Sequence, residues 1–218
     1  MALDKSIGAM PHARIAGRRT HWTLTAYHEA AHAVVALLYG IRVIEACVAP
    51  DRLGSGWMLH ERPGIWATWV PEDRAAAWRM WTQTQIGIER YVKVLLAGPL
   101  AVAKVQGTPL RCLGARSDLA KAIEIEAYLA ERRKEFQIVA VVPDLPDHFL
   151  DRMRRQTRRL IAQPWCWKAI TAVADDLRAW HRLSGDEVAE TVQWSKRTRG
   201  QMSLGLSPPG QTENRARR

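Results

Sequence analysis

The sequence has few cysteines, no phosphate-binding loop and no long apolar run, and each absence excludes a class of protein. Its three cysteines, Cys47, Cys112 and Cys166, form no Cys-x-x-Cys pair, which argues against a disulfide framework and a cysteine zinc site. No Gly-x-x-x-x-Gly-Lys segment occurs, so we expect no ATP hydrolysis by this chain. The longest apolar stretch, Ala33 to Tyr39, is far short of the ~20 residues that span a bilayer.

Length and composition predict one compact domain. A chain of 218 residues that is 47% hydrophobic can bury a sizeable core. We expect residues 1–20 to be a basic flexible segment, 21–195 the folded domain and 196–218 a basic disordered tail. The first segment lacks the apolar stretch of a secretory signal, so the expected location is cytoplasmic, with no membrane partner.

The most informative feature is the motif His28-Glu29-Ala30-Ala31-His32, which lies inside an apolar run. Residues four apart lie on one face of a helix, so His28 and His32 can offer two imidazole nitrogens to one metal ion. The carboxylate of Glu29 would lie beside that ion, where it could take a proton from water and pass it to a leaving amine. The motif therefore predicts a zinc site that hydrolyses peptide bonds.

The surroundings of the motif predict a buried helix, which Thr23 or Thr25 could cap and Gly40 would end. Two histidines and a glutamate are costly to bury unless they are paired, and a metal would offset that cost. The alternative is that the histidines are ordinary hydrogen-bonded core residues.

A catalytic zinc normally takes three protein ligands, so a third one must be found. The metzincin extension would need Gly at position 35 and His at position 38, and the chain has Val35 and Leu38 there, which excludes that class. By chemistry alone, the candidates for the third ligand are His60, Glu61, Glu72, Asp73 and Asp118.

Several segments, in order along the chain, resemble those of the FtsH-type zinc metallopeptidases, the protease half of the membrane AAA proteases. Tyr27 to Val35 resembles their zinc signature, although Ala31 replaces a usual glycine. Leu53 to Trp57 is similar to their edge strand, and Leu96 to Ala101 is similar to their Gly-rich helical segment. Gly114 to Leu119 is similar to their Gly-Ala-x-x-Asp-Leu motif, and Leu183 to Val188 is similar to the start of their closing helix.

This resemblance implies specific roles. Asp118 would be the third zinc ligand, although an aspartate that opens a helix can also be a simple capping residue. A homo-hexamer is implied, and a separate ATPase partner is left open because the family's own ATPase module and membrane anchor are not found in this sequence. The family's acidic residues after the Gly-rich segment are missing, which bears on subunit packing. The residues expected to bind substrate are Gly54, Ser55, Gly56 and Trp57.

The remaining pattern predicts a mainly α fold with a small β-hairpin or edge strand, as in an FtsH-peptidase-like helical domain. Residues 41–48 and 53–60 should form the hairpin. A first helix is expected from Pro71, with a break or kink at Gly98-Pro99. Further helices are expected from Ser117 to about Phe136, from Pro146, from Pro164 and after a capping box of Ser184 and Glu187.

We therefore predict a zinc-dependent metalloendopeptidase that cleaves unfolded or flexible polypeptide segments. His28, His32 and Asp118 would hold Zn²⁺ and Glu29 would activate water. Two alternatives keep the same fold. The first is a basic protein that binds nucleic acid or an acidic protein through its net charge of +10 and the arginines at 152–159, although no recognised DNA-binding motif accompanies them. The second is a pseudo-protease, against which the intact Glu29 argues.

Overall fold

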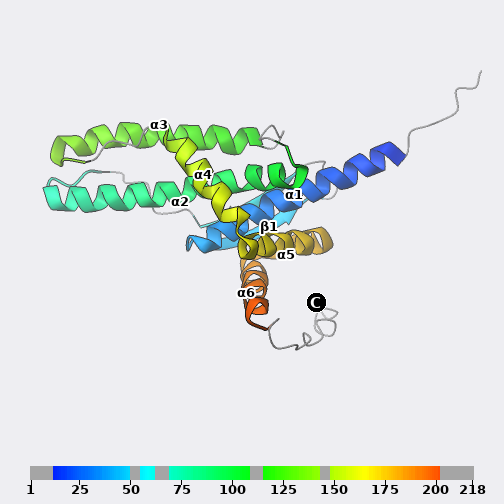
Figure 1. Ribbon diagram of the computed structural model, residues 1–218. Coiled ribbons are helices and arrows are strands. Elements are labelled where there is room, and N and C mark those ends of the chain that lie inside the picture. The colour runs from blue at the N-terminus through cyan, green and yellow to red at the C-terminus, as the bar shows by residue number, and fades with distance from the viewer. Residues whose placement is uncertain (1–11, 50–54, 62–68, 109–114, 143–147, 202–218) are drawn as a thin grey trace, which may run out of the picture.

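A computed structural model describes residues 12–49, 55–61, 69–108, 115–142 and 148–201 of the protein (Figure 1). The expected mainly helical fold with a small β element is confirmed. The helices are α1 (His12–Leu38), α2 (Arg74–Gln106), α3 (Ala115–Val139), α4 (Phe149–Ala162), α5 (Pro164–Trp180) and α6 (Gly185–Gln201), and the strands are β1 (Val43–Val48), β2 (Gly56–His60) and β3 (Arg182–Ser184).

Helix α1 is the element around which the fold is packed. It contacts α2, α5 and both strands of the hairpin, and its small side chains allow these elements to approach its axis closely. The alanines that are fully buried along it are Ala26, Ala30, Ala31, Ala33 and Ala36.

The two ends of α1 differ in how well they were predicted. Gly40, at φ +73°, follows the helix in the left-handed conformation, as expected for a glycine at this end. The helix begins at His12, inside the segment expected to be flexible, so neither Thr23 nor Thr25 caps its start. Instead, the hydroxyl of Thr25 donates to the carbonyl oxygen of His21, one turn earlier in the same helix (3.0 Å).

Helix α2 runs antiparallel to α3, and α4 lies across this pair (Figure 1). Asp73 caps α2 by accepting a hydrogen bond from the Ala76 N–H (2.7 Å). The expected interruption at Gly98-Pro99 does not occur, because α2 continues through both residues. A proline removes one backbone hydrogen bond. Every residue from Val94 to Val102 is buried, and this packing favours continuation of the helix.

The three strands form an antiparallel sheet in the order β2-β1-β3. The predicted hairpin is confirmed, whereas β3 was not predicted because its three residues are too short to show a period. Gly185 follows β3, and a Cβ atom there would lie 1.8 Å from the Val43 carbonyl oxygen. Only glycine therefore allows α6 to start so close to β1.

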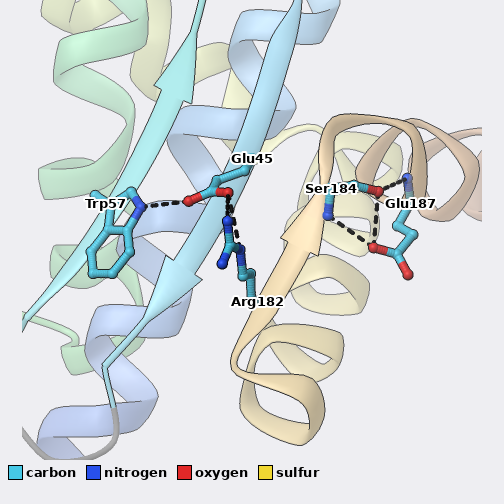
Figure 2. A network of polar contacts seen from close by, with 5 residues as sticks. All are labelled: Glu45, Trp57, Arg182, Ser184 and Glu187. Carbon is cyan, nitrogen blue, oxygen red and sulfur yellow. Dashed lines mark hydrogen bonds and ion pairs between the residues drawn. The ribbon is translucent and has the colours of Figure 1, made fainter. Parts of the chain in front are cut away.

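The predicted capping box at the start of α6 is confirmed (Figure 2). The Ser184 N–H donates to Glu187 Oε2 (2.8 Å), and the Glu187 N–H donates to Ser184 Oγ (3.3 Å). Helix α6 extends to Gln201, past the expected boundary at residue 195, and residues 202–218 lie outside the described part of the chain.

Helices α4 and α5 bury most of the side chains that their spacing predicts. In α4, Phe149, Met153 and Ile161 point inward, but Arg152, expected on the outer face, is half-buried and donates to Glu89 on α2 (2.7 Å). Trp180, at the end of α5, is 53% exposed. None of the helices in the described ranges is both long and apolar enough to cross a membrane.

Candidate metal centre

Side chains from two helices far apart in the sequence converge between α1 and α3. His28 and His32 lie one turn apart on α1, and Asp118 lies in the first turn of α3. Asp118 Oδ2 is 2.9 Å from His28 Nε2 and 3.4 Å from His32 Nε2, and the two Nε2 atoms are 3.0 Å apart. Among the residues that the structure describes, no other group of three such side chains comes together in this way.

The spacing of these atoms fits a zinc ion. In a tetrahedral site with bonds of ~2.0–2.1 Å, neighbouring ligand atoms are about 3.3 Å apart. The three observed separations, 2.9, 3.0 and 3.4 Å, are close to that value. Two imidazole nitrogens and one carboxylate oxygen are also a donor set that catalytic zinc uses, with a fourth position left for a reactant.

The orientation of His32 supports a role as a ligand. Its Nδ1–H donates to the carbonyl oxygen of Val94 on α2 (2.7 Å). With Nδ1 engaged in this way, Nε2 faces His28 and Asp118, and in the neutral imidazole it carries the lone pair that a metal would take. Ligating histidines almost always have such a partner on the second ring nitrogen.

Gly98 on α2 lies directly against the two histidines. A Cβ atom at this position would be 2.4 Å from His32 Nε2 and 2.8 Å from His28 Cε1, closer than non-bonded atoms approach. Glycine is therefore required here because the backbone of α2 forms a wall of the metal centre.

The three candidate ligands have shifted pKa values. Burial, together with the neighbouring His32, lowers the pKa of His28. Burial also disfavours the charged forms of His32 and Asp118, but their hydrogen bond and mutual attraction outweigh it, so the pKa of His32 is raised and that of Asp118 is held far below its usual range. Asp118 is therefore an anion at any physiological pH, as a metal ligand must be.

Glu29 lies beside the ligands, and its side chain is buried. Burial, with a smaller contribution from the charge of Asp118, raises the pKa of Glu29 to about 7 despite the opposing effect of His32. A carboxylate with a pKa near neutral can both accept and return a proton. Its environment therefore suits a general base that later acts as an acid.

Strand β2 begins next to Glu29. A Cβ atom at Gly56 would lie 2.8 Å from Glu29 Cγ and 2.7 Å from Thr25 Cγ2, so a larger residue would collide with α1. The Ala49 N–H donates to the Ser55 carbonyl oxygen (2.9 Å), which sets the hydrogen-bonding pattern of the hairpin. In this pattern the backbone groups of Gly56, Met58 and His60 point away from β1, toward the free edge of the sheet.

The residues expected to bind substrate therefore differ in placement. Gly54 lies outside the described residues. Gly56 presents its backbone to the free edge beside Glu29, whereas the backbone groups of Ser55 and Trp57 point toward β1.

The side chain of Trp57 lies on the face of the sheet that does not pack on α1 (Figure 2). Its indole N–H donates to Glu45 on β1 (2.9 Å), and Glu45 also accepts from Arg182 Nε on β3 (3.0 Å). These hydrogen bonds link the outer faces of all three strands, which gives Trp57 a structural partner away from the metal centre.

The other candidates for the third ligand lie elsewhere. The ring of His60 packs against Tyr91, Glu61 forms an ion pair with Arg42 (2.9 Å), and Asp73 caps α2. Glu72 is exposed just before that cap. Of the five candidates, only Asp118 meets His28 and His32.

Other residues that had been considered play no part in the described centre. Cys47 and Cys166 are buried and lie outside the metal-capable group, and Cys112 lies outside the described residues.

Sequence reasoning missed two features of the site, the Val94 carbonyl and the contact made by Gly98. A backbone carbonyl leaves no trace in the sequence. Gly98 is visible in the sequence, because a glycine inside an otherwise apolar helical pattern often marks a place where another part of the chain comes close to the backbone.

A scan against protein-family models matches none of them, and a search of curated proteins matches none either. The likeness to FtsH-type peptidases therefore rests on the order of the motifs alone.

Proposed function

We propose that this protein is a zinc-dependent metalloendopeptidase of the FtsH type. The observation that carries the proposal is the position of Asp118, which lies 2.9 Å and 3.4 Å from the two histidines of the His-Glu-x-x-His motif. Coincidence is a poor explanation, since a helix capped by an ordinary aspartate has no reason to place that carboxylate between two imidazole nitrogens.

His28, His32 and Asp118 hold the ion in this proposal. When bound, zinc supplies Lewis-acid chemistry: it polarises a carbonyl group and makes water a stronger acid. Glu29 takes the proton from the attacking water and returns it to the leaving amine, and its pKa of about 7 suits both steps. The hydrogen bond from His32 to Val94 holds that imidazole in the required tautomer.

The substrate binds along the free edge of β2. An extended peptide can pair with the outward backbone groups of Gly56, Met58 and His60, which brings it past Glu29. Main-chain pairing gives little sequence preference and requires an extended chain. Suitable substrates are therefore unfolded or flexible polypeptide segments.

The wider setting is part of the same proposal. The likeness to FtsH-type peptidases favours a homo-hexamer, a separate ATPase could deliver unfolded substrates, and a cytoplasmic location is the default expectation. A basic binding protein is less favoured, because two of the five arginines at 152–159 are held in ion pairs, Arg152 with Glu89 and Arg154 with Asp151.

The experiment that tests the proposal is hydrolysis of an unfolded casein-type substrate by the zinc-loaded protein and by Glu29→Gln. The variant should lose about 10²- to 10⁴-fold in rate and keep its zinc. Glu131→Gln, which changes an exposed glutamate on α3, is the matched control and should keep full activity. Equal activity in wild type and Glu29→Gln, or a tightly folded substrate degraded without ATP, would refute the proposal.

A further inference from the structure

Three side chains from three elements meet at the end of β2 that is farther from Glu29. His60, the last residue of β2, packs its ring edge-on against Tyr91 of α2, with centroids 5.3 Å apart. Lys121 of α3 places its Nζ 5.9 Å from the centroid of the same tyrosine ring. Tyr91 lies about two helical turns before Gly98, and Lys121 about one turn after Asp118. Tyr91 and Lys121 therefore lie on helices that also carry Gly98 and Asp118 of the metal centre.

Lys121 gives the trio a positive charge. Lys121 is exposed and forms no ion pair within the described residues. The His60 Nδ1–H donates to the Glu61 carbonyl oxygen (2.7 Å), which holds the imidazole against Tyr91. The Glu61 carboxylate is paired with Arg42, so it does not neutralise the lysine. A carboxylate is the chemical group that complements an exposed ammonium ion.

The free edge of β2 leads from Glu29 to this trio. Gly56, against Glu29, and His60, against Tyr91, lie at the two ends of the strand. At ~3.3 Å per residue the strand spans about 13 Å between them. A peptide that pairs antiparallel with β2 runs from His60 toward Gly56, so its N-terminal part reaches the trio first.

We propose that His60, Tyr91 and Lys121 form a subsite for an acidic side chain that lies about four residues to the N-terminal side of the cleaved bond. This inference rests on the proposed peptidase function and adds a preference to it. Main-chain pairing along β2 holds any extended segment, and the trio selects among such segments for those with Asp or Glu at this position.

The test uses unstructured peptides in which one Glu or one Gln is moved through each position before the cleavage site. In the wild-type protein, kcat/KM should be about threefold higher for Glu than for Gln at the favoured position, because an exposed ion pair contributes modestly. The ratio should fall toward one at high ionic strength. Lys121→Gln should bring the ratio close to one. Lys134→Gln removes the same charge from α3 about 20 Å away and should leave it unchanged.

Binding of the same peptides to Glu29→Gln, followed by fluorescence anisotropy, tests the subsite without hydrolysis. Tighter binding of the Glu peptide that depends on Lys121 supports the subsite, even if the wild type cleaves nothing and the peptidase proposal fails. Cleavage with equal rates for Glu and Gln at every position overturns the subsite and leaves the peptidase intact. Absence of both cleavage and peptide binding overturns both proposals.

Discussion

Gly98→Ala should remove the metal centre while adding one methyl group to a helix. The new Cβ would lie 2.4 Å from His32 Nε2, about 1 Å closer than non-bonded atoms tolerate. Either α2 must move away or His32 must turn, and a displacement of that size exceeds the ~0.2 Å within which metal ligands must stay. Zinc affinity should fall by at least about 100-fold, the upper end of what loss of an outer-shell partner costs.

Competition with a chromophoric chelator measures this affinity directly. Gly87→Ala, the same substitution at a half-buried position about three turns earlier in α2, is the control and should leave zinc affinity unchanged. Helix propensity alone predicts that either alanine stabilises α2 by up to about 1 kcal/mol. If Gly98→Ala binds zinc as tightly as the wild type, the close contact between α2 and the two histidines is not as described.

Three further outcomes test the site and the fold. Zinc affinity should fall as the pH drops from about 8 to about 5, because both imidazoles must be unprotonated to bind the metal. The raised pKa of His32 means that protons compete with zinc at a higher pH than they would for an ordinary histidine. Chelator titrations across this range should show the fall, and a flat profile would contradict it. Free zinc at a thousandfold excess over its Kd should add about 4 kcal/mol to the free energy of unfolding measured with urea, and a gain of equal size in Asp118→Ala would count against the ligand set. Phe136→Ala should lower the free energy of unfolding by about 3–5 kcal/mol in the same assay, because Phe136 is fully buried against Trp81 between α2 and α3. A loss below about 1 kcal/mol would mean that this contact is loose.

The half of the metal centre that lies in one helix could be predicted from the sequence. Helical periodicity places His28 and His32 on one face wherever the helix packs, so the pair depends on local structure alone. The third ligand comes from another helix, and chemistry left Asp118 as one of five candidates. The resemblance to a known peptidase selected it. In the folded chain its carboxylate lies 2.9 Å and 3.4 Å from the two imidazoles, and its role as a ligand stays a prediction.

Other features could not be predicted because tertiary packing overrides local signals. Gly98-Pro99 carries two helix-breaking residues, yet the buried surroundings of α2 keep the helix continuous, and the glycine is needed for contact with the histidines. Strand β3 exists because it pairs with β1, and its three residues carry no period of their own. Trp57 follows the alternation of β2 and points to the outer face, where Glu45 binds it (Figure 2).

The zinc content of the purified protein, measured by inductively coupled plasma mass spectrometry after dialysis, tests the central claim most directly. The account predicts about one zinc per chain in the wild type and in Glu29→Gln, and a large loss in His28→Ala and in Asp118→Ala. A wild-type chain that retains no zinc, or an Asp118→Ala chain that retains it fully, would contradict the claim that His28, His32 and Asp118 form a zinc site.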